Sequence, residues 1–190
     1  MPDLVRCAWC GVDPLYVDYH DREWGLPSRD DQHLFEMLLL EGAQAGLAWI
    51  TILRKREGYR RAFCGFDAER IARFTEADQA RLREDAGIVR NRLKIASAVR
   101  NARAWLRLVE EQGSFADYLW GFVDGRPVQN AFRSLQGLPA STPLSDRISR
   151  DLKQRGFNFV GSTIVYAYLQ SVGVVNDHVV GCFRHREVQP

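Results

Sequence analysis

Cysteine and histidine residues near both ends of this 190-residue chain restrict its fold more than any other feature. Cys7, Cys10 and His20 lie near the start, and His178 and Cys182 stand four residues apart near the end. Residues with that spacing share one face of a helix, so the second pair can reach one ion. Two thiolates and two imidazoles form the closed tetrahedral ligand set of a structural zinc site, which would tie the two ends together.

Two other interpretations of these residues stay open. They can be buried cysteines and ordinary histidines without a metal, or the segment CAWC can be a redox CxxC motif, although the βαβ context typical of that motif is missing. The start of the chain lacks an apolar signal sequence, and no apolar run approaches the ~20 residues of a membrane span. We therefore expect a cytoplasmic protein without membrane contact, whose reduced thiols favour metal binding over disulfides.

Apolar spacing and capping residues predict an almost entirely helical chain. Thr75 with Asp78 resembles a capping box, Gly87 suits a helix stop, and Thr142 followed by Pro143 is typical of a helix start. The expected helices cover residues 33–42, 45–56, 67–74, 79–85, 91–111, 114–125, 142–156, 161–171 and 174–182. The length is enough for one sizeable core, and no repeat or nucleotide-binding glycine motif appears.

Two stretches indicate contact with a polyanion. Residues 90–107 contain six basic side chains and no acidic one, whereas a solvated helix face usually carries both signs. Gly156 and Gly161 bracket a turn between two helices, which leaves free N–H groups for a phosphate at the start of the second helix. A plain turn and an ordinary basic helix are the alternative interpretations.

One carboxylate lies among aromatic residues in the N-terminal third. DPLYVDYHDREWG contains Tyr16, Tyr19 and Trp24, and the apolar segment after it carries Glu41 and Trp49. Aromatic faces with one carboxylate suit a flat, electron-poor heterocycle that stacks on the rings and is hydrogen-bonded at its edge. Alternatively, the aromatic residues form the core, and Glu41 lies on the surface or caps the neighbouring turn.

Long segments of the chain resemble the constitutive (type I) 3-methyladenine DNA glycosylases of bacteria. They are RCAW, DPLYVDYHDREWG, LFEMLLLEGAQAGLAWITIL and RGFNFVGSTIVYAYLQSVGVVNDHVVGC, within about residues 6–182. The resemblance implies an all-α, helix-hairpin-helix DNA glycosylase fold in one unit over residues 1–190, with a hairpin at about 150–171 and a zinc ion joining the termini. It also implies a monofunctional, monomeric enzyme that hydrolyses the N-glycosidic bond of N3-methyladenine in double-stranded alkylated DNA and leaves an abasic site.

The resemblance assigns roles to residues by position. The structural Zn²⁺, one per chain, falls on Cys7, His20, His178 and Cys182, and Cys10 is left out. The base pocket falls on Glu41, Tyr16, Tyr19 and Trp49, with Trp9 nearby. The DNA-binding positions are Leu47, a candidate wedge, and Gly156, Gly161, Ser162 and Thr163 of the hairpin.

Many helix-hairpin-helix glycosylases place a catalytic aspartate just before the segment that here reads VVNDHVV. Alignment on His178 puts Asn176 at that place, and helical geometry would turn the adjacent Asp177 elsewhere. We therefore expect catalysis without a dedicated aspartate. Glu41, the expected catalytic residue, would be a buried, ionised carboxylate that reads the base. A hydrogen-bonding tyrosine and the cationic base would oppose the rise in its pKa on burial.

Two functions from other classes compete with this one. A non-catalytic, zinc-stabilised DNA-binding module would explain the hairpin, the basic helix and the metal ligands, but not Glu41 among aromatic residues. A zinc hydrolase needs an open metal position for water, and four protein ligands leave none.

Overall fold

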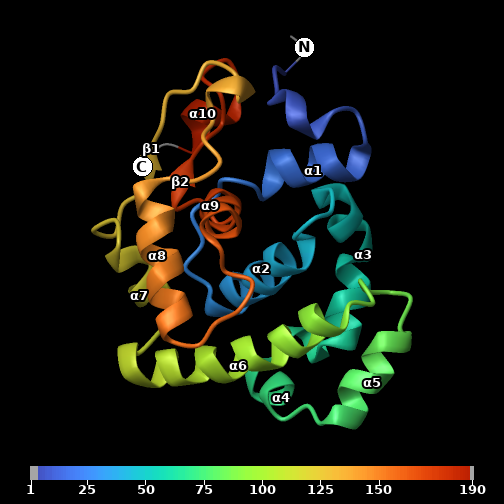
Figure 1. The fold of residues 1–190 in the computed structure, drawn as a ribbon. Coiled ribbons are helices and arrows are strands. Elements are labelled where there is room, and N and C mark those ends of the chain that lie inside the picture. Colours follow the sequence, from blue (N-terminus) through green and yellow to red (C-terminus); the bar gives the residue numbers. More distant parts are fainter. Residues whose placement is uncertain (1–3, 189–190) are drawn as a thin grey trace.

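The computed structural model describes residues 4–188, which form mostly helices (Figure 1). The α-helices are α1 Pro14–Arg22, α2 Asp31–Gln44, α3 Trp49–Ala62, α4 Ala68–Ala72, α5 Glu76–Glu84, α6 Arg92–Gln112, α7 Phe115–Gly121, α8 Pro143–Gln154, α9 Ser162–Ser171 and α10 Arg184–Glu187. Short 3₁₀ turns cover Ala8–Cys10, Cys64–Phe66 and Leu135–Gly137. The strands β1 Val128–Gln129 and β2 Val175–Asn176 form one parallel pair, so the expectation of a purely α chain is wrong at that point.

Capping residues fix several helix ends at the predicted places. Thr75 and Asp78 form a complete capping box at α5, and Thr142 caps α8 with Pro143 at its first turn. The predicted stop at Gly87 is wrong, because α5 ends at Glu84. The Gly87 backbone instead packs closely against Gly58, since a Cβ atom on Gly58 would lie 2.2 Å from the Gly87 carbonyl oxygen.

Helix α2 passes through the centre of the molecule, where it packs against α3, α6, α7 and α9 (Figure 1). Every residue from Leu34 to Ala43 is buried, as expected for a helix covered on all sides. This position buries two carboxyl groups. Glu36 forms ion pairs with Arg56 and Arg60, whereas Glu41 forms no ion pair within residues 4–188.

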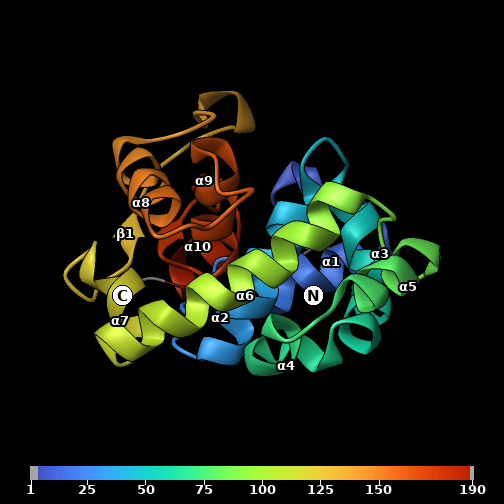
Figure 2. The same cartoon turned by 60° about the horizontal axis from the view of Figure 1, so that its bottom comes forward.

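The long helix α6 crosses the molecule between two groups of helices, and Figure 2 brings it to the front. On one side lie α8 and α9, which pack against each other, and on the other lie α1, α3 and α5. The N- and C-terminal segments meet, since the Phe183 N–H donates to the Val5 carbonyl oxygen at 2.9 Å. None of the helices within residues 4–188 has the length and apolar character needed to cross a membrane.

Two predicted helical segments adopt other conformations. Residues 174–182 form β2 and an irregular turn, because Val174 and Asn176 accept hydrogen bonds from the β1 side of the strand pair. His178 and Cys182 therefore do not share a helix face, and a turn closed by the Cys182 N–H and the Val179 carbonyl oxygen brings them together. Residues 45–48 form a turn with Gly46 at φ +78° ahead of α3.

Candidate active site and metal cluster

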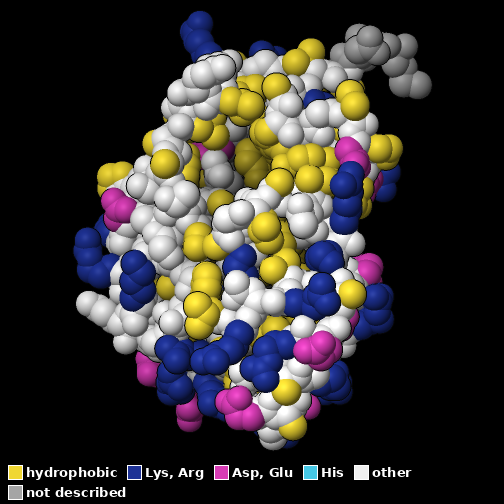
Figure 3. All heavy atoms as spheres, turned by 45° about the vertical axis from the view of Figure 1, so that its right-hand side comes forward, with side chains coloured by type: hydrophobic (Ala, Val, Ile, Leu, Met, Phe, Trp, Pro, Cys, Tyr) yellow, Lys and Arg dark blue, Asp and Glu magenta, His cyan; other side chains and the backbone are white. Residues whose placement is uncertain are grey.

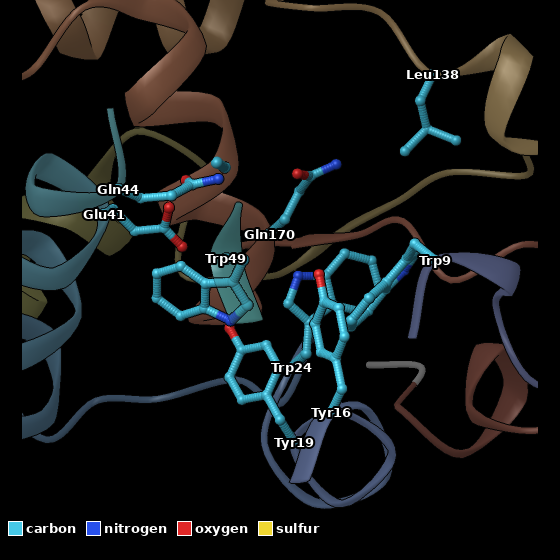
Figure 4. A pocket seen from close by; sticks show the side chains of 10 residues that line it. Trp9, Tyr16, Tyr19, Trp24, Glu41, Gln44, Trp49, Leu138 and Gln170 are labelled. Atoms are coloured by element: carbon cyan, nitrogen blue, oxygen red, sulfur yellow. The ribbon is translucent and has the colours of Figure 1, made fainter. Parts of the chain in front are cut away.

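Aromatic side chains and one carboxyl group surround a pocket of about 180 Å³ (Figure 4). Its lining is Trp9, Tyr16, Tyr19, Trp24, Glu41, Gln44, Trp49, Leu138, Ala167 and Gln170. The five residues that the resemblance assigned to a base pocket therefore all line this one pocket. The pocket is smaller than the roughly 300–1,000 Å³ of sites for drug-sized ligands, so it suits one small, flat molecule.

The aromatic rings form two groups in the pocket. The Trp9 ring centroid lies 5.0 Å from that of Tyr16 and 4.9 Å from that of Trp24. The Tyr19 and Trp49 centroids are 5.5 Å apart, and Figure 4 shows this pair on the side of the pocket where Glu41 lies. A flat ligand would therefore meet apolar ring surface beside a single carboxyl group.

Three buried polar atoms of the pocket have no hydrogen-bond partner within the described chain. They are the Tyr19 hydroxyl, the Trp49 Nε1 and the Glu41 Oε2. Leaving such a group unpaired costs about 1–3 kcal/mol. All three belong to residues that line the same pocket, so a ligand with a polar edge can satisfy them together.

Burial changes the protonation of Glu41. Removal from water raises its pKa to about 8, and the Ser171 hydroxyl opposes this rise only in part. At neutral pH the carboxyl group of the unliganded protein therefore keeps its proton, which differs from the ionised carboxylate that we expected. The expected tyrosine hydrogen bond is not formed by Tyr19, whose hydroxyl has no partner among the described residues. A cationic ligand beside Glu41 would favour the ionised form.

Some residues of the pocket are absent from the sequence assignment. Gln44 follows Glu41 by three residues on α2, and Gln170 follows Ala167 by three on α9, so helical spacing was an available signal. Trp24 was visible as part of the aromatic segment but carried no assignment. Leu138 comes from the irregular stretch between α7 and α8, where no periodic pattern marks it.

The predicted metal ligands Cys7, His20, His178 and Cys182 form one buried cluster. Their four ligand atoms all lie within 4.8 Å of one another. The Cys182 Sγ is 3.5 Å from the His20 Nε2 and 3.6 Å from the His178 Nδ1. Zinc bonds of about 2.3 Å to sulfur and 2.0–2.1 Å to nitrogen give a tetrahedral S···N separation of roughly 3.5 Å, so the cluster can hold such an ion.

Groups around the cluster orient its two imidazoles. The Nδ1 of His20 lies 2.7 Å from the Asp21 carboxylate, and the Nε2 of His178 lies 3.0 Å from the Trp24 carbonyl oxygen. A proton on each of these nitrogens leaves the opposite nitrogen free to face the cluster. The pKa of Cys182 lies well below its usual range because the Cys7 thiol and both imidazoles hydrogen-bond to its sulfur.

Cys10 does not belong to the cluster. Its thiol donates instead to the Cys7 carbonyl oxygen at 3.2 Å. The four cluster residues are each at most 2 % exposed, which leaves no solvent-facing position for a metal-bound water. This burial weighs against the zinc hydrolase.

The turn between α8 and α9 has the predicted glycines, but they differ in role. Gly156 has φ +92°, whereas a Cβ atom on Gly161 would meet nothing within 4 Å, so the start of α9 is open to a ligand. Thr163 is exposed there, while the Ser162 hydroxyl is hydrogen-bonded to Asp146. Asn101 of α6 fixes this turn by pairing with both the N–H and the carbonyl oxygen of Asn158.

The predicted wedge and basic helix also have defined surroundings. Leu47 is 40 % exposed in the turn after α2, and the Lys94 ammonium holds that turn through the Ala43 and Ala45 carbonyl oxygens at 2.7 and 2.6 Å. Within residues 4–188, no basic side chain of the stretch 90–107 takes part in an ion pair. Its positive charge is therefore not neutralised by a carboxylate of those residues.

The family model described as methyladenine glycosylase matches residues 9–185, which is most of the chain. The chain belongs to the methyladenine glycosylase family. Its relative DNA-3-methyladenine glycosylase 1 of Escherichia coli (strain K12) is 51 % identical over 179 residues, which are 94 % of this chain and 96 % of that protein.

Solved structures agree with membership of the methyladenine glycosylase family. A crystal structure of 3-methyladenine DNA glycosylase I matches with a TM-score of 0.92 and 52 % identity, over 98 % of this chain and 100 % of that one. A variant of 3-methyladenine DNA glycosylase I in complex with 3-methyladenine matches with a TM-score of 0.91 and 36 % identity, over 94 % of this chain and 96 % of that one.

Proposed function

We propose that this protein is a monofunctional DNA glycosylase that hydrolyses the N-glycosidic bond of N3-methyladenine in alkylated double-stranded DNA. The observation that carries the proposal is the aromatic pocket in which Tyr19, Glu41 and Trp49 each leave a buried polar atom unpartnered. The names of the E. coli relative and of the matched structure with bound 3-methyladenine support it.

The pocket can receive a base only after the nucleotide leaves the stack. Extrusion costs a few kcal/mol and is easier for a damaged base. N3-methyladenine in DNA is a cation, so the bond between the sugar and the base breaks with the electron pair going to the base, which leaves as a neutral molecule. Water supplies the oxygen that replaces it on the sugar. No strong acid is needed, and within residues 4–188 Glu41 is the only carboxyl residue that lines the pocket.

Glu41 has the central role in this scheme. Its carboxylate accepts hydrogen bonds from the amino edge of the base and stabilises the positive charge, while Trp9, Tyr16, Tyr19 and Trp49 provide stacking surface. A cationic base in the pocket favours the ionised form of Glu41 that burial disfavours in its absence. Binding of the cationic base would thus cause Glu41 to lose its proton.

DNA binding would involve three elements, which are Leu47, the turn between α8 and α9, and the basic stretch of residues 90–107. Leu47 is the proposed wedge that fills the gap left by the extruded base. The turn around Gly156 and Gly161, with Ser162 and Thr163 at the start of α9, is the proposed helix-hairpin-helix phosphate site. Figure 3 shows a hollow lined by hydrophobic side chains on the same face as a group of Lys and Arg in the part of the molecule where α4, α5 and α6 lie.

Zinc would have a structural role. Cys7, His20, His178 and Cys182 would hold one Zn²⁺, which neutralises the thiolates and joins the two ends of the chain. We further propose that residues 1–190 act as a single helix-hairpin-helix unit, as a monomer in the cytoplasm.

Incubation of the protein with methylated DNA, followed by identification of the released bases, tests this function. We expect free 3-methyladenine and an uncut strand with an abasic site. Strand cleavage through a covalent intermediate needs an amine nucleophile, and none of Lys55, Lys94 and Lys153 lines the pocket. Borohydride trapping of a protein–DNA adduct would contradict the monofunctional activity. DNA binding without base release would instead favour the non-catalytic module.

A further inference from the structure

Asp177 is a buried carboxylate directly behind one wall of the pocket. It is 1 % exposed and does not line the pocket itself. Its Oδ1 accepts from the Asn130 Nδ2 at 2.6 Å, and its Oδ2 accepts from the Gln170 Nε2 at 2.8 Å and from the Tyr166 hydroxyl. No Lys or Arg side chain within residues 4–188 pairs with it, so these three neutral donors must satisfy the carboxylate.

Gln170 connects this carboxylate to the pocket. A carboxylate only accepts hydrogen bonds, so the Gln170 amide must turn its nitrogen toward Asp177 and its oxygen away. In Figure 4 the Gln170 amide oxygen lies on the side of Gln44 and Glu41, and the nitrogen lies on the opposite side. No group within residues 4–188 donates a hydrogen bond to this oxygen. Gln170 therefore presents a free acceptor of fixed orientation to a ligand.

We propose that Asp177 locks the Gln170 carbonyl oxygen toward the pocket and that Gln170 thereby sets a preference for alkylated adenine over alkylated guanine. This inference rests on the proposed function. The amino group of adenine carries two N–H donors, and Glu41 on α2 and Gln170 on α9 supply two acceptors for them. Guanine has a carbonyl oxygen at the same ring position, which would face the Gln170 oxygen unpaired. Asp177 touches no substrate and is a positioning residue.

The Asp177→Asn variant should reverse the Gln170 amide. The introduced asparagine can keep its oxygen toward Asn130, but its NH₂ group then replaces Oδ2 as the partner of Tyr166 and Gln170. The Tyr166 hydroxyl can rotate to accept from that NH₂ group. Gln170 must turn its oxygen toward it, which points the Gln170 NH₂ group into the pocket, where it favours a carbonyl oxygen.

The test uses one preparation of methylated DNA that contains both 3-methyladenine and 3-methylguanine. The ratio of their release rates should fall about tenfold in Asp177→Asn, because adenine release drops while guanine release is kept or rises. Melting temperature and zinc content report on the fold of the variant. An equal fall of both rates would mean that Asp177 has only a structural role, and the proposal would be wrong.

Two further variants separate orientation from stability. In the Asp177→Asn, Gln170→Glu double variant, one oxygen of the introduced glutamate accepts from the introduced asparagine and the other faces the pocket. The release ratio should therefore return toward that of the wild type. Gln170→Met removes the acceptor from the pocket wall without changing Asp177, and it should lower the ratio even if Asp177→Asn fails to fold. A wild-type ratio in Gln170→Met would overturn the proposal.

A measurement on the protein alone separates this inference from the proposed function. Hydrogen exchange of the Gln170 side-chain NH₂ group, followed by NMR, should be slower than that of the exposed Gln154 and should change in Asp177→Asn. Exchange as fast as that of Gln154 would contradict the lock. Failure of the wild type to release either base would contradict the proposed function, while slow exchange would still support the lock.

Discussion

The cysteine–histidine cluster and the aromatic pocket are both buried polar sites, but they differ in whether their polar atoms have partners within the described chain. In the cluster, four ligand atoms face one another, and Asp21 and the Trp24 carbonyl oxygen hold the outer nitrogens of the imidazoles. In the pocket, three polar atoms have no partner within the described chain. A single small ion would complete the cluster permanently, whereas only a ligand that enters and leaves completes the pocket. The difference separates a structural site from a recognition site.

Breaking the cluster should give the largest effect. Cys182→Ser or His178→Ala removes one of four ligands, so we expect loss of zinc together with a fall of ~4 kcal/mol or more in the free energy of unfolding. Elemental analysis for zinc and urea unfolding measure the two quantities.

Cys10→Ser is the matched control for the cluster. Cys10 is equally buried and only three residues from Cys7, but its thiol contacts backbone oxygens. Zinc content and stability should therefore stay near the wild-type values. Full zinc occupancy in Cys7→Ser would contradict the ligand assignment and point to Cys10.

The burial of Glu41 in the pocket should make the free energy of unfolding depend on pH. The pKa of Glu41 in the folded protein is about 8, above its ordinary value of 4.5. The stability contribution of protonated Glu41 is thus complete below pH 4.5 and is lost as the pH rises to about 8. Relative to Glu41→Gln, the wild type should lose about 2–5 kcal/mol of unfolding free energy across this window. Urea unfolding of both proteins from pH 5 to pH 9 measures this difference. If the free energies of unfolding of the two proteins changed with pH in the same way, the raised pKa would be refuted.

The smallest effect should come from the basic surface, which belongs to neither site. Arg92 is exposed and has no ion pair within residues 4–188. Arg92→Ala should weaken binding to undamaged DNA a few-fold and reduce the salt dependence by about one counterion, without changing affinity for the free base. The control is Arg22→Ala, because Asp18 already neutralises Arg22. A salt dependence unchanged by Arg92→Ala would exclude Arg92 from the DNA interface.

Local signals in the sequence predict most of the helices. Asn91 and Gly113 mark the two ends of α6, and Thr142 marks the start of α8, because capping depends on neighbouring residues alone. The metal ligands and five pocket residues were also predicted, since their residue types and family motifs identify them. Their functional roles remain proposals.

The remaining features depend on contacts between distant segments. The β1–β2 pair is two residues long and has no detectable period, yet it removes residues 174–182 from the predicted helix. Asp177 does not line the pocket, which agrees with the expectation that it points elsewhere. The reason differs, because the strand pair and the hydrogen bond from Gln170 determine its orientation, and no helix does. The protonation of Glu41 likewise depends on its burial by helices that are distant in the sequence, which no local pattern reveals.

Affinity for free 3-methyladenine in Glu41→Gln tests the central claim most directly. The measurement is made at pH 9, above the Glu41 pKa of about 8, so that the carboxylate is ionised in the wild type. The substitution keeps the size of the side chain, loses that charge and points an amide donor at the amino group of the base. Charge-assisted hydrogen bonds contribute about 1.5–3 kcal/mol, so the free base should bind about tenfold to a hundredfold more weakly, measured by calorimetry. Excision should fall at least as much, and affinity for undamaged DNA should hardly change.

Glu36→Gln provides the comparison for this measurement, because Glu36 is buried on the same helix but is paired with Arg56 and Arg60 outside the pocket. It should bind the base like the wild type even if it is less stable. The account predicts weaker binding only in Glu41→Gln. If Glu41→Gln abolished excision yet bound 3-methyladenine as tightly as the wild type, Glu41 would act on the chemical step and its role in recognition would be wrong.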